Sequence, residues 1–325
     1  MNAVIMAGGQ GTRLMPLTAN MPKPMASIAG KPCIIRTLEH LRRYGINDAA
    51  VTVAYKKEQI KQALVAEHVR FYEEERPLGT AGSVKKCADF VDDNFIVISG
   101  DAVCDFDLSA IIAAHMSHHD PVTIVLTESD DPLEYGVCVL DDNGVITRFI
   151  EKPSWECVYS NLVNTGIYVL SRSVLDYVPA DKPFDFSKDL FPLLMAKGIT
   201  IHGYKADGYW CDIGNIREYM RCNRDVLCGA ADIEFSSEPC PGADVRPPCV
   251  IGKNVRAEGA VIGPYAVIGD GCVIGEGCVV EGSILGRNCE IADSGRVQNA
   301  LLCDNVKCGP GVKVYDYAVI SDNCT

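Results

Sequence analysis

Long apolar runs are missing from this 325-residue sequence, since no stretch approaches the ~18 to 20 apolar residues that span a membrane. The N-terminus also lacks the basic segment, apolar run and cleavage site of a secretory signal. These absences predict a cytoplasmic protein with no membrane partner. With 48% apolar residues the chain still has ample material for a hydrophobic core, and its length allows two domains.

Basic charge is scarce, because 30 Lys and Arg residues stand against 43 Asp and Glu residues, a net charge of −13 at pH 7. A general nucleic-acid surface needs a basic footprint, so the sequence predicts no nucleic-acid partner. A nucleotide substrate stays compatible with this charge, because acidic residues can hold a divalent cation that accompanies the phosphates.

Paired cysteine motifs are absent, although the chain contains 16 cysteines. No C-x-x-C occurs and the cysteines are scattered through the sequence. We therefore expect reduced thiols that serve mainly as small core residues. Histidine is also infrequent, and the last of the six histidines is His202.

The pattern of apolar residues divides the chain into two parts. Up to about residue 228, short apolar runs alternate with amphipathic segments, which predicts an α/β domain with a mixed, mostly parallel sheet. Residues 34–44 are expected to form a helix, and the expected strands include residues 3–7, 50–54, 95–98, 122–126, 145–150 and 166–170. Residues 229–248 are rich in Pro, Ser, Gly and Asp, which predicts a linker.

Residues 249–325 follow a different period, with aliphatic residues every six positions at Ile262, Ile268, Ile274 and Val280. Small residues, including Cys272 and Cys278, precede these positions by two. Such a hexapeptide repeat predicts a parallel β-helix whose strands each bury one aliphatic side chain. Its last coil would leave an open strand edge, so we expect the β-helix to join subunits of a homo-oligomer, unless the chain is part of a longer one. A β-helix can also host an acyltransferase, but this one has no histidine to act as general base.

The N-terminal segment combines glycines with basic residues. The strand at residues 3–7 runs into Gly8, Gly9 and Gly11, and Arg13 and Lys23 follow. Glycines let the backbone turn tightly and present bare N–H groups to phosphate oxygens, while the two cations add full positive charge. The spacing matches neither G-x-G-x-x-G nor a P-loop lysine, so neither of those nucleotide-binding folds is indicated.

The complete string G-G-x-G-T-R-L-x-P-L-T-x-x-x-P-K-P resembles the signature of the sugar-nucleotide pyrophosphorylases, which are nucleotidyltransferases. Further segments resemble elements of that family in the expected order, at residues 75–83, 99–101, 151–153, 164–166 and 209–214. The resemblance covers nearly the whole chain. It implies a Rossmann-like α/β nucleotidyltransferase domain over residues 1–228, followed by a left-handed parallel β-helix over residues 249–325.

The same resemblance implies a set of site residues. The catalytic residues would be Arg13, Lys23 and Asp101, and Mg²⁺ would be coordinated by Asp101 and Asp212. The nucleotide would be contacted by Ala7, Gly8, Gly9, Gly11, Thr12, Gly79, Thr80 and Gly82. The sugar phosphate would be contacted by Gly136, Glu151, Lys152, Asn164 and Thr165. Asp105 and Asp107 follow Asp101 closely and are interpreted as turn or cap residues.

The implied activity is attack of a sugar 1-phosphate on the α-phosphate of a nucleoside triphosphate, with Mg²⁺ as cofactor and pyrophosphate as leaving group. The G-T-A-G loop and the C-terminal repeat most resemble the guanylyltransferases of the family, so GTP and mannose 1-phosphate are the expected substrates. Transfer to glucose 1-phosphate from UTP, dTTP or ATP stays open, as does a catalytically inactive regulatory or scaffold paralogue. One departure is visible, because the connection at residues 65–68 is shorter than the family commonly has.

Overall fold

A computed structural model describes all residues from Met1 to Thr325. The chain forms two compact units. The first, here called the sheet unit, comprises Met1–Gly9 and Ile34–Trp210, and the second, the β-helix unit, comprises Gln10–Cys33 and Cys211–Thr325. The segment that carries Arg13 and Lys23 thus belongs to the same unit as the C-terminal repeat. No helix has the length and apolar character needed to cross a membrane.

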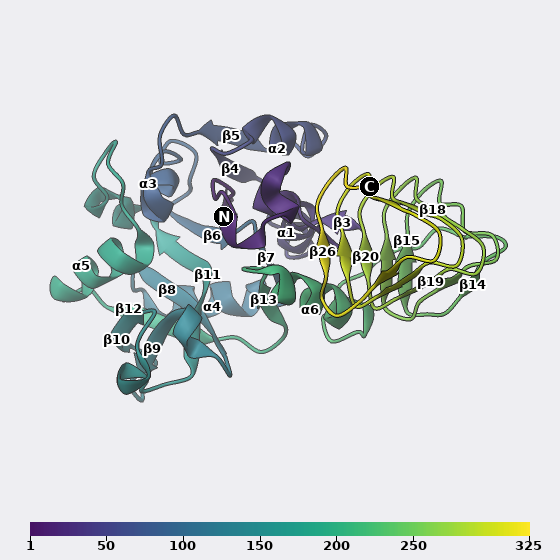
Figure 1. The fold of residues 1–325 in the computed structure, drawn as a ribbon. Coiled ribbons are helices and arrows are strands. Elements are labelled where there is room, and N and C mark those ends of the chain that lie inside the picture. Colours follow the sequence, from purple (N-terminus) through teal and green to yellow (C-terminus); the bar gives the residue numbers. More distant parts are fainter. The chain divides into compact units, whose positions relative to one another are not determined.

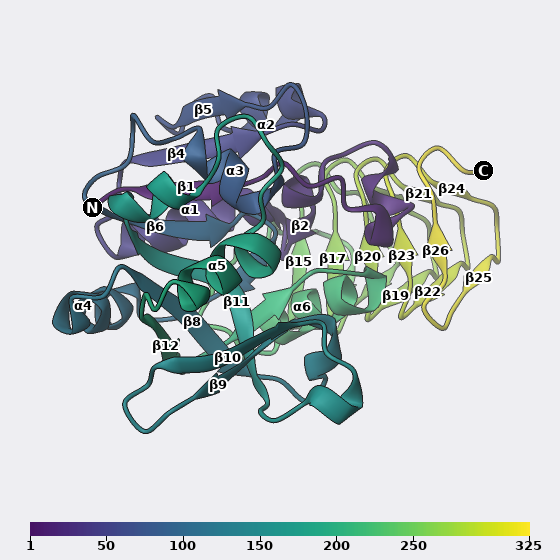
Figure 2. The same cartoon turned by 90° about the vertical axis from the view of Figure 1, so that its left-hand side faces the viewer.

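A nine-stranded mixed sheet forms the centre of the sheet unit (Figure 2). Parallel ladders join β6, β1, β4 and β5, while β11 pairs in antiparallel fashion with β6, β8 and β9. The strands are β1 (Ala3–Met6), β4 (Ala49–Val53), β5 (Arg70–Glu73), β6 (Asn94–Ser99), β8 (Val122–Glu128), β9 (Gly136–Leu140), β10 (Ile146–Glu151), β11 (Leu162–Ser171) and β12 (Ile201–Lys205). The alternating pattern therefore predicted the sheet correctly, because buried strands and amphipathic helices differ in period.

Five α-helices begin within or at the border of the sheet unit. They are α1 (Cys33–Arg43), α2 (Lys57–Ala63), α3 (Gly79–Lys85), α4 (Leu108–His118) and α5 (Phe191–Ala196). The first of these confirms the helix predicted at residues 34–44, and Ile34, Leu38 and Leu41 of α1 are buried. The helix ends one residue before Tyr44, and Gly45 follows with a φ of 77°.

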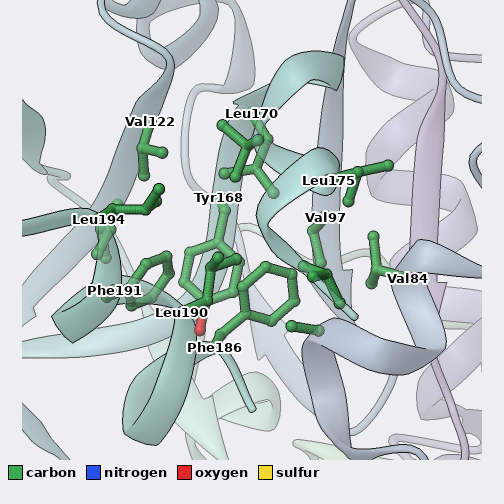
Figure 3. Packing of buried hydrophobic residues seen from close by; sticks show 14 of the residues in the cluster. Val84, Val97, Val122, Tyr168, Leu170, Leu175, Phe186, Leu190, Phe191 and Leu194 are labelled. Atoms are coloured by element: carbon green, nitrogen blue, oxygen red, sulfur yellow. The ribbon is translucent and has the colours of Figure 1, made fainter. Parts of the chain in front are cut away.

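An aromatic cluster packs against one face of the sheet (Figure 3). The ring centroid of Tyr168 on β11 lies 4.9 Å from that of Phe186 and 5.2 Å from that of Phe191. All three side chains are at most 3% exposed. Their burial anchors the segment from residue 184 to α5 against the sheet, which matters for the site below.

The repeat forms a β-helix of parallel strands in three sheets, and its stacked coils are drawn in green to yellow in Figure 1. The three sheets run β14-β16-β19-β22-β25, β15-β17-β20-β23-β26 and β18-β21-β24. Their strands are β14 (Asp244–Val245), β15 (Cys249–Ile251), β16 (Val261–Ile262), β17 (Ala266–Ile268), β18 (Val273–Ile274), β19 (Val279–Glu281), β20 (Ile284–Leu285), β21 (Glu290–Ile291), β22 (Arg296–Gln298), β23 (Leu301–Leu302), β24 (Lys307–Cys308), β25 (Lys313–Val314) and β26 (Val319–Ile320). The repeat therefore predicted the parallel β-helix correctly, and the three sheets are consistent with the left-handed form that the resemblance implied.

The aliphatic and small positions of the repeat fill the β-helix core. Ile262 and Val280 are fully buried, and Cys272 and Cys278 are also at 0% exposure. All 16 cysteines of the chain are free thiols, as expected. The first strand, β14, lies within residues 229–248, so the coils begin earlier than the apolar period indicates.

Three further elements lie in the β-helix unit or at its border: the hairpin β2 (Ser27–Ile28) and β3 (Lys31–Pro32), the strand β13 (Trp210–Asp212), and the helix α6 (Ile216–Leu227). Buried Asn223 of α6 accepts a hydrogen bond from Ala29 N at 2.8 Å and donates to Tyr219 O at 3.0 Å. The hairpin turn also contacts the β-helix, since a Cβ on Gly30 would lie 2.9 Å from Cγ1 of Val250. The N-terminal segment of this unit is therefore packed on both α6 and the coils.

Candidate active site

The loop after β1 continues in the β-helix unit as three short 3-10 turns, Thr12–Leu14, Leu17–Ala19 and Lys23–Met25. Gly11 has a φ of 66°, and a Cβ there would lie 2.8 Å from Cβ of Lys23. The Thr18 hydroxyl donates to Gly11 O at 2.7 Å. Leu14 and Leu17 are buried beneath the loop. Glycine at position 11 is therefore required both by backbone conformation and by the close approach of Lys23.

Lys23 and Asp212 form an ion pair with 2.8 Å between Nζ and Oδ1. Lys23 is only 8% exposed, so its charge needs this partner. Arg13 is exposed, and its guanidinium lies beside the chain at Gly214, where a Cβ would be 3.5 Å from Nη2. The β-helix unit thus brings together three of the predicted charged residues: Arg13, Lys23 and Asp212.

The loop begins at the carboxyl end of β1 in the sheet unit, where Ala7 N donates to Thr52 O at 3.0 Å. Beside it lies Glu74, whose Oε1 is 3.2 Å from the position that a Cβ on Gly8 would occupy. The other carboxylate oxygen accepts a hydrogen bond from Leu78 N at 3.0 Å. Burial raises the pKa of Glu74 above its usual range. A desolvated carboxylate therefore lies between Gly8 and the start of α3, where Gly79, Thr80 and Gly82 are predicted to contact the nucleotide.

Residues 79–82 form the first turn of α3, which packs against the segment that the aromatic cluster anchors. Gly79 has a φ of 71°, and a Cβ on it would lie 2.6 Å from Phe184 O. Gly82 N donates to the same carbonyl at 2.9 Å. The Thr80 hydroxyl donates to Asp185 Oδ2 at 2.9 Å. Packing of this kind leaves room for backbone but not for larger side chains at position 79.

The predicted sugar-binding residues meet at the same segment. Gly136 pairs with Glu151 across β9 and β10, and a Cβ on Gly136 would lie 2.9 Å from Oε2 of Glu151. Asn164 on β11 donates to Tyr168 Oη at 3.0 Å and to Ser187 Oγ at 3.5 Å. Burial raises the pKa of Glu151, helped by the charge of Asp185, while a hydrogen bond from Ser187 opposes the shift. Polar groups of several elements thus converge at one place in the sheet unit.

Two of the predicted sugar-phosphate residues have other surroundings. Thr165 is 2% exposed, and its hydroxyl donates to Val125 O at 2.8 Å. Its hydroxyl therefore has a partner within the sheet, and the expected sugar contact of this residue stays a prediction. Lys152 is exposed, with Nζ 4.0 Å from Glu134 Oε2, and a surface pair of this length holds the ammonium only weakly. Its side chain is accessible to an anion.

Asp101 follows the carboxyl end of β6, at the sheet edge where open α/β sheets bind ligands. The Ser99 hydroxyl donates to its Oδ1. Gly100 N donates to Met6 O at 2.9 Å, which fixes the turn beside β1. The next two aspartates are structural, as predicted: Asp105 accepts from Tyr209 N at 2.6 Å, and Asp107 caps α4 by accepting from Ala110 N at 3.1 Å.

Asp101 and Asp212 carry carboxylate groups, the kind of hard oxygen ligand that Mg²⁺ prefers. No group of three or more His, Cys, Asp or Glu side chains has the geometry of a metal site. Mg²⁺ bound with a nucleotide usually takes one or two carboxylates and completes its shell with phosphate oxygens and water. Asp101 belongs to the sheet unit and Asp212 to the β-helix unit, so their sharing of one ion stays a prediction.

Sequence reasoning missed Glu74, Asp185 and Ser187. A helix-start signal could have indicated the segment that holds the last two, because Asp185 precedes an apolar run. In the structure its carboxylate accepts hydrogen bonds from Ser187 N at 3.0 Å and Lys188 N at 3.4 Å. Glu74 lies among three consecutive glutamates, Glu73, Glu74 and Glu75. Nothing in that run indicates which carboxylate is desolvated.

The fold agrees with what known proteins show. The family profile described as "Nucleotidyl transferase" matches residues 2–228, and the chain belongs to this family. A second profile, described as "GMPPB C-terminal domain", matches residues 245–325. Both parts of the chain are thus assigned, and the nucleotidyltransferase resemblance is confirmed.

Individual relatives share the architecture but differ in the substrates for which they are named. The chain is 35% identical to a UTP--glucose-1-phosphate uridylyltransferase of Synechocystis, covering 100% of this chain and 88% of the relative. It is 30% identical to an Arabidopsis thaliana protein named "Probable mannose-1-phosphate guanylyltransferase 2", covering 99% of this chain and 98% of that one. The crystal structure of HddC from Yersinia pseudotuberculosis, complexed with GMP-PN, has a TM-score of 0.60 at 30% identity and covers 69% of this chain and 99% of its own. The protein is a nucleotidyltransferase that acts on a sugar 1-phosphate.

Proposed function

We propose that the protein transfers GMP from GTP to mannose 1-phosphate and releases pyrophosphate. The match of residues 245–325 to the GMPPB C-terminal domain and the guanylyltransferase name of the Arabidopsis relative support this choice. The similar HddC structure, a complex with GMP-PN, adds support for a guanine nucleotide.

The observation that carries the choice of base is Glu74. Guanine presents two adjacent hydrogen-bond donors, N1–H and the N2 amino group, on its Watson–Crick edge. A carboxylate accepts both, because its two oxygens offer about four lone-pair sites and Leu78 N occupies one of them. Uracil and thymine present a single donor between two carbonyl oxygens, and adenine presents an acceptor beside its amino group. Glu74, next to Gly8 and Leu78, therefore favours guanine.

The proposed roles of the remaining residues follow from charge and position. Arg13 and the backbone from Gly8 to Thr12 would hold the triphosphate, and Lys23 would stabilise charge at the reacting phosphate. Lys152 would orient the attacking sugar phosphate, while Glu151 and Asn164 would bind sugar hydroxyls. These contacts would bring two anionic substrates into line, which is the main catalytic task in phosphoryl transfer.

Mg²⁺, when bound by Asp101 and Asp212, would offset phosphate charge and polarise the α-phosphate. The carboxylates fit this role chemically because hard oxygen ligands suit the ion. The ion pair with Asp212, at 2.8 Å, would keep the ammonium group of Lys23 near that carboxylate.

A second candidate function is supported by one specific observation. The Synechocystis uridylyltransferase is 35% identical over the whole of this chain, a higher identity than that of the Arabidopsis relative. The alternative reaction would join UTP and glucose 1-phosphate on the same residues, with a different base pocket and sugar contact.

The proposal is tested by pyrophosphate release with Mg²⁺, measured for four nucleoside triphosphates against mannose 1-phosphate and glucose 1-phosphate. We expect the highest kcat/KM for GTP with mannose 1-phosphate. In Glu74→Gln, one acceptor position becomes a donor, so the ratio of kcat/KM for GTP over UTP should fall by about 10-fold or more, the discrimination typical of a lost bidentate base contact. Glu75→Gln changes the neighbouring exposed carboxylate and is the matched control.

A wild-type preference for UTP would overturn the guanylyltransferase proposal in favour of the second candidate. An unchanged base ratio in Glu74→Gln would remove Glu74 from base recognition. Folded protein that is inactive with every substrate pair would favour the regulatory paralogue.

A homo-oligomer formed through the β-helix stays a prediction, which light scattering of the purified protein would check.

A further inference from the structure

We propose that Asn20 and Asp322 form a positioning contact through which the last coil of the β-helix sets the placement of the loop that carries Arg13 and Lys23. The inference rests on the proposed roles of these two cations. Its central observation is a hydrogen bond of 2.6 Å from Asn20 Nδ2 to Asp322 Oδ2, between residues 302 positions apart. All the residues involved belong to the β-helix unit.

Asp322 is held firmly because it ends a ladder of aspartates along the coils. Asp270 Oδ1 accepts from Lys253 N at 2.7 Å, and Asp304 Oδ1 accepts from Arg287 N at 2.8 Å. In the last coil, Asp322 Oδ1 accepts from Asp304 N at 2.8 Å. Each carboxylate thus satisfies a backbone amide of the preceding coil. Asp322 differs from the other members because its second oxygen binds the N-terminal loop.

The loop links the contact between Asn20 and Asp322 to the position of Lys23. Asn20 ends the second 3-10 turn, and Lys23 begins the third, with Pro22 and Pro24 on either side of it. Proline fixes φ, so a displacement at Asn20 cannot be absorbed easily before Lys23. Lys23 is buried and is paired with Asp212, and Ala26 N donates to Lys23 O at 3.0 Å. A shift of the second turn should therefore move the ammonium group or weaken its ion pair.

The other end of the segment is anchored independently. The β2–β3 hairpin is held by Asn223, through Ala29 N at 2.8 Å, and by close packing of Gly30 against Val250. Figure 2 shows the purple segment with β2 beside the coils labelled β15 and β17. With the hairpin end fixed in this way, Asn20 and Asp322 provide a second attachment, and the loop between Gly11 and Met25 is held on the last coil instead of extending freely.

The test exchanges the two side chains. Asn20→Asp places two carboxylates against each other, and we expect kcat to fall about 10-fold, since small misplacements of catalytic groups cost rates of that order. The double variant Asn20→Asp with Asp322→Asn restores an amide–carboxylate pair in reverse and should return kcat to within about threefold of wild type. The KM for the sugar 1-phosphate should stay unchanged, because the contact acts on the cations of the loop.

The matched control is Asn323→Asp, in the same coil. Asn323 Oδ1 accepts from Asn305 Nδ2 at 3.2 Å, a role that a carboxylate oxygen fills equally well, so we expect no change in kcat. Hydrogen exchange gives a readout that needs no turnover. The amides of Met25 and Ala26, bonded within the third turn, should exchange faster in Asn20→Asp and return to wild-type rates in the double variant.

The outcomes separate the role of the contact from the role of the loop. If Lys23→Ala loses activity while Asn20→Asp keeps wild-type kcat and exchange rates, the positioning contact is overturned and the role of Lys23 stands. If the double variant stays as slow as Asn20→Asp, the effect is not transmitted through the pair, and the inference is equally overturned. Full activity in Lys23→Ala would contradict the proposed role of the loop itself.

Discussion

At the scale of single residues, the charged groups of the candidate site are held by their neighbours. Lys23 is buried and paired with Asp212, and Asp101 accepts a hydrogen bond from Ser99. A buried charge that loses its partner costs several kcal/mol, so these positions combine a structural requirement with the proposed chemistry. Substitutions that keep size and hydrogen bonding but remove charge are therefore the informative ones.

Asp101→Asn is such a substitution, because an amide oxygen can still accept from the Ser99 hydroxyl. Removal of the negative charge should reduce Mg²⁺-dependent pyrophosphate release by about 100-fold or more, as expected when a charged group is lost from a phosphoryl-transfer site. Thermal unfolding should show a Tm close to wild type. Asp107→Asn is the control, since asparagine caps a helix as well as aspartate does and activity should persist. Near-full activity in Asp101→Asn would remove the metal assignment.

At the scale of elements, the loop of residues 10–25 has little regular structure and depends on its turns. Three 3-10 turns pack around Gly11, and buried Leu14 and Leu17 hold them in place. The order of these turns places two cations close to α6 and β13. Backbone hydrogen bonds close each turn, and the Thr18 hydroxyl ties the second turn to Gly11 at the start of the first.

Gly11→Ala should disrupt this element. The left-handed backbone costs a residue with a Cβ about 1–2 kcal/mol, and the contact of 2.8 Å with Cβ of Lys23 adds to that cost. We expect lower stability in denaturant titration and a loss of most activity. Gly9→Ala, where a Cβ would meet nothing within 4 Å, should leave stability unchanged. Equal stability of the two variants would show that the turn can relax.

At the scale of the whole molecule, the two units differ in their histidine content. All six histidines precede residue 203, and several are buried in the sheet unit, including His40 and His115. Burial lowers the pKa of His40 to about 4 and also lowers that of His115. The β-helix coils contain no histidine, so this source of acid sensitivity is confined to the sheet unit.

Stability should therefore fall in mild acid. The unfolded chain binds a proton at His40 below about pH 6.5, whereas the folded chain does so only near pH 4. In that window the unfolded state binds more protons, so the free energy of unfolding decreases as pH falls, by roughly 2 kcal/mol between pH 6.5 and 5 for this residue. Denaturant titrations at pH 7 and 5 should show a smaller difference in His40→Leu than in wild type. The exposed control His119→Asn should keep the wild-type difference, and an unchanged difference in His40→Leu would contradict the prediction.

The sequence by itself determined the features that depend on local spacing. The six-residue period identified the β-helix, and the alternation of short apolar runs with amphipathic segments identified the strands and helices, because these patterns follow from local backbone geometry. The signature string likewise placed Gly11, Arg13 and Lys23 in one loop, since they are close in the chain.

Only the tertiary structure decided the contacts between distant residues. Lys23 pairs with a carboxylate 189 positions away, and Asn20 reaches a residue 302 positions away. The segment at Asp185 and Ser187 joins the predicted base and sugar residues because aromatic packing anchors it, and Thr165 is directed into the sheet. Such contacts arise from the packing of whole elements, which no local period encodes.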